Sequence, residues 1–175
     1  MNKGSGLLWG FVGTVMLTGL MAAGQGLGLT RINLPYMVGT MFTADRDRAK
    51  LIGFIAHFVN GWLFASVYAA AFESWRRSTW WLGAAIGAVH GAFVLLAALP
   101  MLPALHPRMA SEQHGPTPTR QLEPPGFLGL NYGYRTPLSV FLAHLLYGGI
   151  IGAFYRPRSS RRSRGARLRR LLAGQ

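Results

Sequence analysis

Residues 138–155 read LSVFLAHLLYGGIIGAFY, a run without a single Lys, Arg, Asp or Glu. An α-helix rises about 1.5 Å per residue, so a run of this length nearly crosses the roughly 30 Å hydrocarbon core of a bilayer. Three other stretches are comparably long and apolar, at residues 7–24, 51–72 and 80–99. The sequence therefore predicts an all-α membrane protein with four transmembrane helices in a domain over residues 1–155.

The composition agrees with this class. Half of the residues are hydrophobic and only 13% are charged, against about 25% charged residues in a typical soluble domain. The mean hydropathy is +0.24. The chain has no Cys, which excludes disulfides, thiol catalysis and Cys-ligated metal centres.

Two of the predicted spans have features that need comment. Pro100 and Pro103 follow the third stretch, and we expect them to disturb or end that helix. The first stretch has an alternative interpretation as a cleaved signal peptide, with Lys3 as its basic region and residues 21–23 as a small-residue cleavage site. An internal repeat, described below, gives this helix a partner and favours its retention.

The distribution of basic residues predicts the orientation. Arg76 and Arg77 follow the second stretch, and eight Arg lie in the tail that follows the fourth, residues 156–175. Because Lys and Arg near span ends stay in the cytoplasm, we expect both termini there. Arg greatly outnumbers Lys, which is typical of a GC-rich bacterial genome, so the predicted location is the bacterial inner membrane.

The formal net charge of +13 suggests nucleic-acid binding, but the charge is concentrated in the tail. Such a cluster next to a span is expected to bind anionic lipid headgroups, which makes nucleic acid the weaker interpretation. Residues 167–172 have the pattern of a short basic amphipathic helix. The simpler alternative is a disordered tail that only sets the topology.

The two outer loops differ in character. Residues 34–42 read LPYMVGTMF, which is too apolar for a free aqueous loop, and we expect them to fold back onto the bundle or to lie in the interface. Asp45 suits the N-terminus of the helix that follows. The second outer loop, residues 106–137, is Pro-rich, and we expect it to be irregular, with His106 and His114 exposed to solvent.

An internal repeat links the second and fourth spans. A shift of 87 positions places residues 39–68 on residues 126–155 without a gap. Both copies read Ala-His-x3-Gly-x3-small-x2-Tyr, and at about 100° per residue these positions share one helix face. The sequence predicts two duplicated hairpins related by a parallel pseudo-two-fold axis. The matched pairs include Gly39/Gly126, His57/His144, Gly61/Gly148 and Tyr68/Tyr155.

The first and third spans match more weakly. Gly83, Gly87 and Gly91 form a small-x3-small-x3-small face on the third span, with His90 beside it. Small residues at this spacing let helix backbones approach closely in lipid. We expect these glycines at helix contacts, and His90 to be a packing or hydrogen-bonding residue.

His57 and His144 form the candidate functional pair, with Gly61, Tyr68, Gly148 and Tyr155 as companions on the same faces. Ionisable residues inside a membrane mark functional sites. A pair of imidazoles could bind haem or a metal, or handle protons or a small solute. The simpler interpretation is that each His pins its hairpin by a hydrogen bond to a neighbouring carbonyl. No intramembrane acid accompanies the pair.

Three features resemble small four-span bacterial membrane proteins that carry no assigned activity. They are the Gly10-x2-Gly13-Thr14 start, the LPYMVGTM segment at residues 34–41, and the His57-x3-Gly61-x6-Tyr68 helix. The resemblance covers about residues 6–70 and again 126–155. It implies location and architecture only.

The function expected from the sequence is that of a non-enzymatic subunit, scaffold or accessory factor. The lipid bilayer is the first partner, and other membrane subunits or further copies of the chain are candidates. The alternative is a redox or transport protein that uses His57 and His144.

The orientation gives the first prediction. A topology reporter fused after Gln175, or inserted at Ser78, should report the cytoplasm, because both positions follow basic span ends. A reporter inserted at Thr117 should report the outside. The opposite pattern at any of these sites is incompatible with four spans in this orientation.

Overall fold

The computed structural model describes residues 1–110 and 115–158, and this part of the chain is helical, with one isolated β-bridge between Met109 and Leu122. His114 and the predicted amphipathic helix of the tail lie outside the described residues. The elements in chain order are α1 (Lys3–Gly26), α2 (Leu34–Thr40), α3 (Arg46–Ser74), α4 (Trp80–Phe93), the π-helical turn η1 (Val94–Ala98), α5 (Leu99–Leu105), the 3-10 turn η2 (Phe127–Tyr132) and α6 (Thr136–Phe154).

Four helices are long and apolar enough to cross a membrane: α1, α3, the continuous helix Trp80–Leu105, and α6. The prediction of four long apolar helices is therefore confirmed, and each helix begins earlier or ends later than its apolar stretch. Large apolar side chains cover their outer faces, with Val89 71% and Leu63 63% exposed. An apolar exterior is what a helical protein needs in lipid.

The two prolines disturb the third span, as expected, but they do not end it at Leu99. The helix widens into η1, where the Leu99 N–H donates to the Val94 carbonyl five residues earlier. It then continues as α5 through Pro100 and Pro103 to Leu105. Proline removes the hydrogen bond to the carbonyl four residues back and crowds that carbonyl. A π-type turn just before Pro100 accommodates this defect without breaking the helix.

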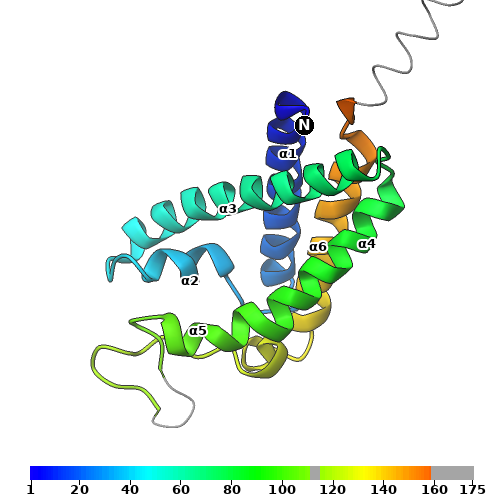
Figure 1. Cartoon of the computed structure of the whole chain (residues 1–175). Helices are drawn as coiled ribbons and strands as arrows, with labels where there is room; N and C mark the ends of the chain where they lie inside the picture. Colours follow the sequence, from blue (N-terminus) through cyan, green and yellow to red (C-terminus); the bar gives the residue numbers. More distant parts are fainter. Residues whose placement is uncertain (111–114, 159–175) are drawn as a thin grey trace, which may run out of the picture.

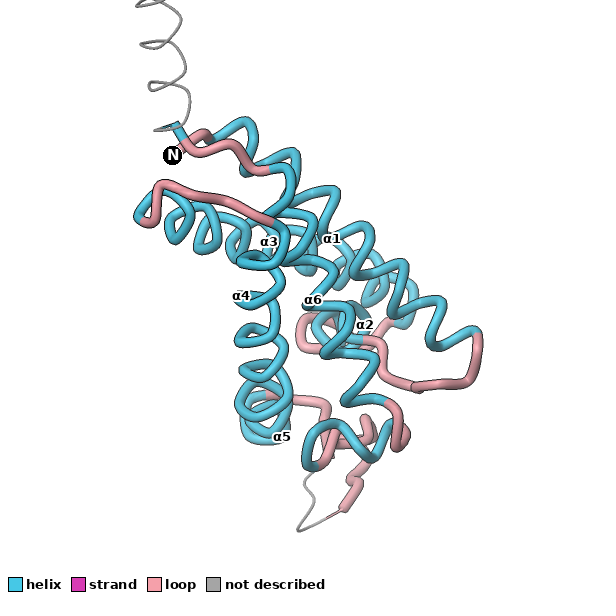
Figure 2. Tube along the Cα trace, turned by 90° about the vertical axis from the view of Figure 1, so that its right-hand side faces the viewer, coloured by secondary structure: helices cyan, strands magenta, loops and turns pink. Residues whose placement is uncertain are grey.

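The helices do not form a regular four-helix bundle. α6 packs against both α1 and α4, and α1 also packs against α3. After the loop at residues 75–79, α3 and α4 diverge like the arms of a V, with α2 lying between them near the open end (Figure 1). Figures 1 and 2 both place the N-terminus beside the end of α6, as an even number of spans requires.

Glycines form the contact between α4 and α6, as predicted. A Cβ atom on Gly83 would overlap the Gly148 carbonyl, and one on Gly87 would overlap the His144 carbonyl. A Cβ on Gly152 would reach the backbone of Gly83 in turn. The two backbones therefore lie in direct contact, and this is possible only because these glycines have no side chains.

The remaining predicted glycines also lie at helix contacts. Gly61 of α3 faces Thr14 of α1. A Cβ atom added to Gly91 of α4 would lie 3.2 Å from the Cβ of His144 on α6.

The first outer loop folds back onto the bundle, as its apolar sequence predicted. Its residues form α2, which packs against the start of α3 so closely that a Cβ on Gly53 would overlap the Pro35 carbonyl. Asp45 caps α3 by accepting a hydrogen bond from the Arg48 N–H at 2.8 Å.

His106 is buried, and the expectation that it is solvated was wrong. Its exposed fraction is 1%. Its Nε2–H donates to the Met37 carbonyl at 2.9 Å, and its Nδ1 accepts from the Arg108 N–H at 3.1 Å. The second outer loop thus uses this imidazole to hold the end of α2, a long-range contact that no local pattern reveals.

The fold as a whole does not show the duplicated hairpin. Gly39 lies in α2, whereas its counterpart Gly126 lies in a loop with φ of +70° ahead of η2. The α1–α6 packing also lacks a matching α4–α3 packing.

The glycine contact gives the second prediction. Gly87→Leu should lower the free energy of unfolding by about 1–3 kcal/mol or more, because the added side chain meets the α6 backbone and has no void to fill. The measurement is thermal denaturation in detergent. Gly19→Leu is the matched control, since a Cβ at this α1 position has no neighbour within 4 Å. Equal stability of the two variants would show that α4 and α6 do not meet at this face.

Candidate functional site

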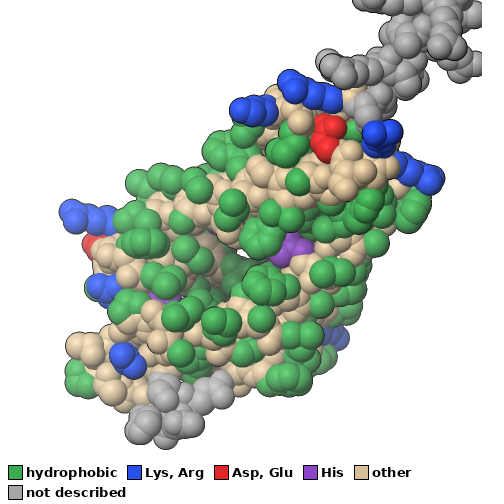
Figure 3. Space-filling view, viewed as in Figure 1, with side chains coloured by type: hydrophobic (Ala, Val, Ile, Leu, Met, Phe, Trp, Pro, Cys, Tyr) green, Lys and Arg blue, Asp and Glu red, His purple; other side chains and the backbone are tan. Residues whose placement is uncertain are grey.

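A cavity of about 400 Å³ lies between the diverging arms α3 and α4. Its walls come from all four spans and from α2. Figure 3 shows a hollow between α3 and α4 in which histidine is visible among hydrophobic side chains. The cavity lies where α4, packed on α6 through the glycine contact, diverges from α3.

The cavity brings together three histidines from three different helices, His57 on α3, His90 on α4 and His144 on α6. The sequence predicted the first and third as a pair and placed His90 apart from them. Among the described residues, no Lys, Arg, Asp or Glu lines the cavity. Three imidazoles therefore meet in an uncharged, largely apolar enclosure.

His57 lies between the cavity and a smaller pocket of about 60 Å³ against α1 and α2. Its Nε2 atom is buried and has no hydrogen-bond partner in the described residues. A buried polar atom without a partner costs free energy, about 1–3 kcal/mol. Protein atoms enclose this Nε2, so His57 lines the cavity with other atoms of its side chain.

His144 is 5% exposed and donates from Nδ1–H to the Val140 carbonyl, one turn earlier, at 2.7 Å. This bond fixes Nδ1 as a protonated nitrogen and leaves Nε2 as the remaining ring nitrogen. The His144 ring meets the His90 ring edge to face, with centroids 4.6 Å apart.

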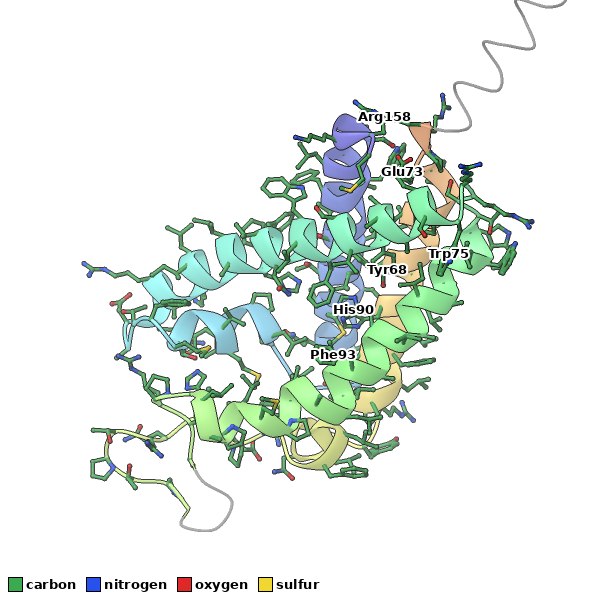
Figure 4. The ribbon with its side chains drawn as sticks, viewed as in Figure 1. Tyr68, Glu73, Trp75, His90, Phe93 and Arg158 are labelled. Carbon is green, nitrogen blue, oxygen red and sulfur yellow. The ribbon has the colours of Figure 1, made fainter. Side chains whose placement is uncertain are left out.

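His90 is held on two sides. Its ring stacks on Phe64 of α3 at a centroid distance of 3.8 Å, and its Nδ1 lies 3.3 Å from the Tyr68 hydroxyl (Figure 4). It is thus a packing and hydrogen-bonding residue, and it is also part of the cavity wall. Phe64 and Tyr68 bridge to it near the closed end of the V.

The predicted companions of the histidines do not all belong to this site. Tyr68 contacts His90, and Gly61 lines the cavity, whereas Gly148 is occupied in the contact with α4. Tyr155 lies beyond the end of α6 and donates to Glu73 at 2.8 Å. Partial burial raises the pKa of Tyr155 to about 12, so this hydroxyl keeps its proton at neutral pH.

The Tyr155 contact belongs to a separate cluster at the end of the molecule that holds the N-terminus. Glu73 also accepts from the backbone N–H of Asn2 at 3.2 Å and of Arg158 at 3.1 Å (Figure 4). One carboxylate therefore joins α1, α3 and the residues after α6, at a distance from the cavity.

The sequence did not single out Asn60 and Tyr147, which also line the cavity. Asn60 is an exposed amide in the middle of α3. Tyr147 donates its hydroxyl to the Gly61 carbonyl and so ties α6 to α3. The two residues occupy equivalent positions in the repeat, three after each histidine, and a polar side chain within an apolar run was the signal that could have identified them.

The described residues contain no group of three His, Asp or Glu side chains placed to hold a metal ion. Haem is also a poor match, because its two carboxylates would find no cation in the lining. The arrangement suits hydrogen bonding to a neutral molecule.

The hydrogen bonds of the imidazoles give the third prediction. In ¹⁵N-histidine NMR spectra, His106 should carry its proton on Nε2, whereas Nδ1 of His144 should be protonated. Tyr68→Phe should shift the His90 nitrogen resonances and leave those of His106 unchanged. Protonated Nδ1 in His106, or an unprotonated Nδ1 in His144, would contradict this geometry.

Comparison with protein-family models, with curated proteins and with solved structures finds no match.

Proposed function

We propose that this chain is a non-enzymatic membrane protein that binds a small lipid-soluble molecule in the cavity between α3 and α4, as a carrier or as an accessory subunit. The observation that carries the proposal is the cavity itself, an uncharged enclosure within the spans that three imidazoles share. Its volume lies within the range of about 300–1,000 Å³ that is usual for ligand sites.

The route of access supports this proposal. α3 and α4 do not pack against each other along the open part of the V. Leu63 and Phe93 line the cavity and are also 63% and 52% exposed on the outer surface. In a bilayer these exposed faces meet lipid, so a molecule dissolved in the membrane could enter sideways without crossing water.

The character of the lining supports a binding role. Most of the wall is aliphatic or aromatic, and a few polar groups converge on it, which is the usual composition of a small-molecule site. The histidines have no carboxylate partner in the wall, so the acid–base pairs of hydrolytic enzymes have no equivalent in it.

The proposal includes the location, the orientation and the duplication. The protein would reside in the bacterial inner membrane with both termini in the cytoplasm, as in the family it resembles. Equivalent glycines support a duplicated origin, since Gly61 packs on α1 and Gly148 packs on α4. The two hairpins would then have diverged, and the open side between α3 and α4 would be the place where the symmetry was lost.

Photolabelling gives the fourth prediction. A diacylglycerol with a diazirine on its acyl chain should label Leu17 when the protein is reconstituted in liposomes. Leu17 is only 5% exposed and lines the cavity, so bulk lipid does not reach it directly. Labelled positions are identified by mass spectrometry of the digested protein.

A filling variant tests whether the label enters through the cavity. Ala98→Trp places a large ring in the cavity and should reduce labelling of Leu17 about tenfold, equivalent to about 1.4 kcal/mol. Val89→Trp, on the outer face of α4, should leave it unchanged. Absence of label at Leu17 in the unmodified protein, or equal labelling in both variants, would refute the binding site.

A further inference from the structure

We infer that the molecule held between α3 and α4 has a quinol or quinone head, a planar ring with an oxygen on each of two opposite edges, and an apolar tail. This inference rests on the proposed function and adds the chemical class of the ligand.

The charge of the lining restricts the head group first. Within residues 1–110 and 115–158, no cationic or anionic side chain faces the cavity. A phosphate or carboxylate head would be desolvated there without a counter-ion, which is strongly unfavourable in lipid. The ligand head is therefore polar but neutral.

The histidines of α4 and α6 provide one pair of complementary groups. The Tyr68 hydroxyl is buried, and His90 Nδ1 is its partner in the described residues, so the hydroxyl donates and the His90 proton resides on Nε2. His144 has its proton on Nδ1, which leaves Nε2 as an acceptor. Two adjacent rings thus offer one donor and one acceptor, a combination that a single hydroxyl group satisfies fully.

The opposite wall, on α3, provides a second polar position. The Asn60 amide lines the cavity from α3, one turn beyond the enclosed Nε2 of His57. An ordinary lipid alcohol has a single hydroxyl group and could form hydrogen bonds with only one of the two walls. A ring with oxygens on opposite edges could bond to both walls at once.

The aromatic side chains favour a flat ring between these two positions. Phe64, His90 and His144 form a continuous series of ring contacts, with centroid distances of 3.8 Å and 4.6 Å. Planar ligands gain dispersion and quadrupole interactions against such a wall. The open side between α3 and α4 leaves room for the tail to extend into the bilayer.

The test uses competition against the diazirine-diacylglycerol label at Leu17. A benzoquinol with a ten-carbon tail should displace the label at a lower concentration than decylbenzene, which has the same ring and tail but no oxygen. The reductant that keeps the quinol reduced cannot alter the protein's covalent structure, because the chain has no Cys. Displacement by decylbenzene as effective as that by the quinol would overturn the inference.

Variants of the α3 wall test the hydrogen bonds. Asn60→Leu should weaken quinol competition about three- to tenfold, the usual effect of one lost hydrogen bond. Competition is expressed relative to the uncompeted labelling of the same variant. Asn60 is exposed, so its variant is not expected to disturb folding. Ser66→Ala is the matched control, because Ser66 bonds within α3 and does not line the cavity.

The outcomes separate the two proposals. Labelling of Leu17 that neither quinol nor quinone displaces would reject the quinol class and leave the binding function intact. Equal quinol competition in Asn60→Leu and Ser66→Ala would likewise reject the quinol class alone. Absence of labelling in the uncompeted protein would reject the binding function, and this inference with it.

Discussion

The contact between the backbones of α4 and α6 is the interaction on which the rest of the arrangement depends. In lipid, apolar side chains gain little by leaving their surroundings, so close packing and hydrogen bonds decide which helices associate. The glycines of α4 and α6 allow a backbone-to-backbone approach that no other pair of the four long helices in the described residues matches. Once α4 is packed on α6, it cannot also follow α3, although α3 precedes it along the chain. The V-shaped opening is a consequence of that packing.

The same contact positions the polar groups. α6 carries His144 towards α4, where Gly91 leaves space for its side chain beside His90. α3 approaches this pair through Phe64 and Tyr68 and then diverges, which leaves His57 and Asn60 on the far wall. Polar groups that would be costly against lipid are thus gathered on one internal surface, partly paired with each other and partly open to a ligand.

Much of the architecture could be predicted from the sequence, because hydropathy over about twenty residues reports directly on the ability to span a bilayer. The capping role of Asp45, the folded-back apolar loop and the glycine contacts also follow from local chemistry. The passage of the third span through Pro100 could not be predicted, since it depends on a π-type turn in the residues before it. The prediction for His106 was wrong because its burial depends on where α2 lies.

The site was predictable only in part. His57 and His144 stand out as ionisable residues at equivalent positions of a repeat, and both line the cavity. His90 has no counterpart in the repeat, and its association with them depends on which helices pair. Several helices carry a face of small residues that could pack against another helix. A single sequence does not show which of these possible helix pairs is the most stable. For the same reason the repeat itself suggested a symmetric bundle, whereas α3 and α4 are separated.

The central position of α6 has a consequence for biogenesis. This helix is synthesised last of the four, yet it supplies the packing surface for both α1 and α4. Before α6 is in place, the glycine face of α4 has no partner in the described residues, and the main packing between the three earlier long helices is that of α1 on α3. The position of α4 is therefore fixed only once the last of the four long helices has been made.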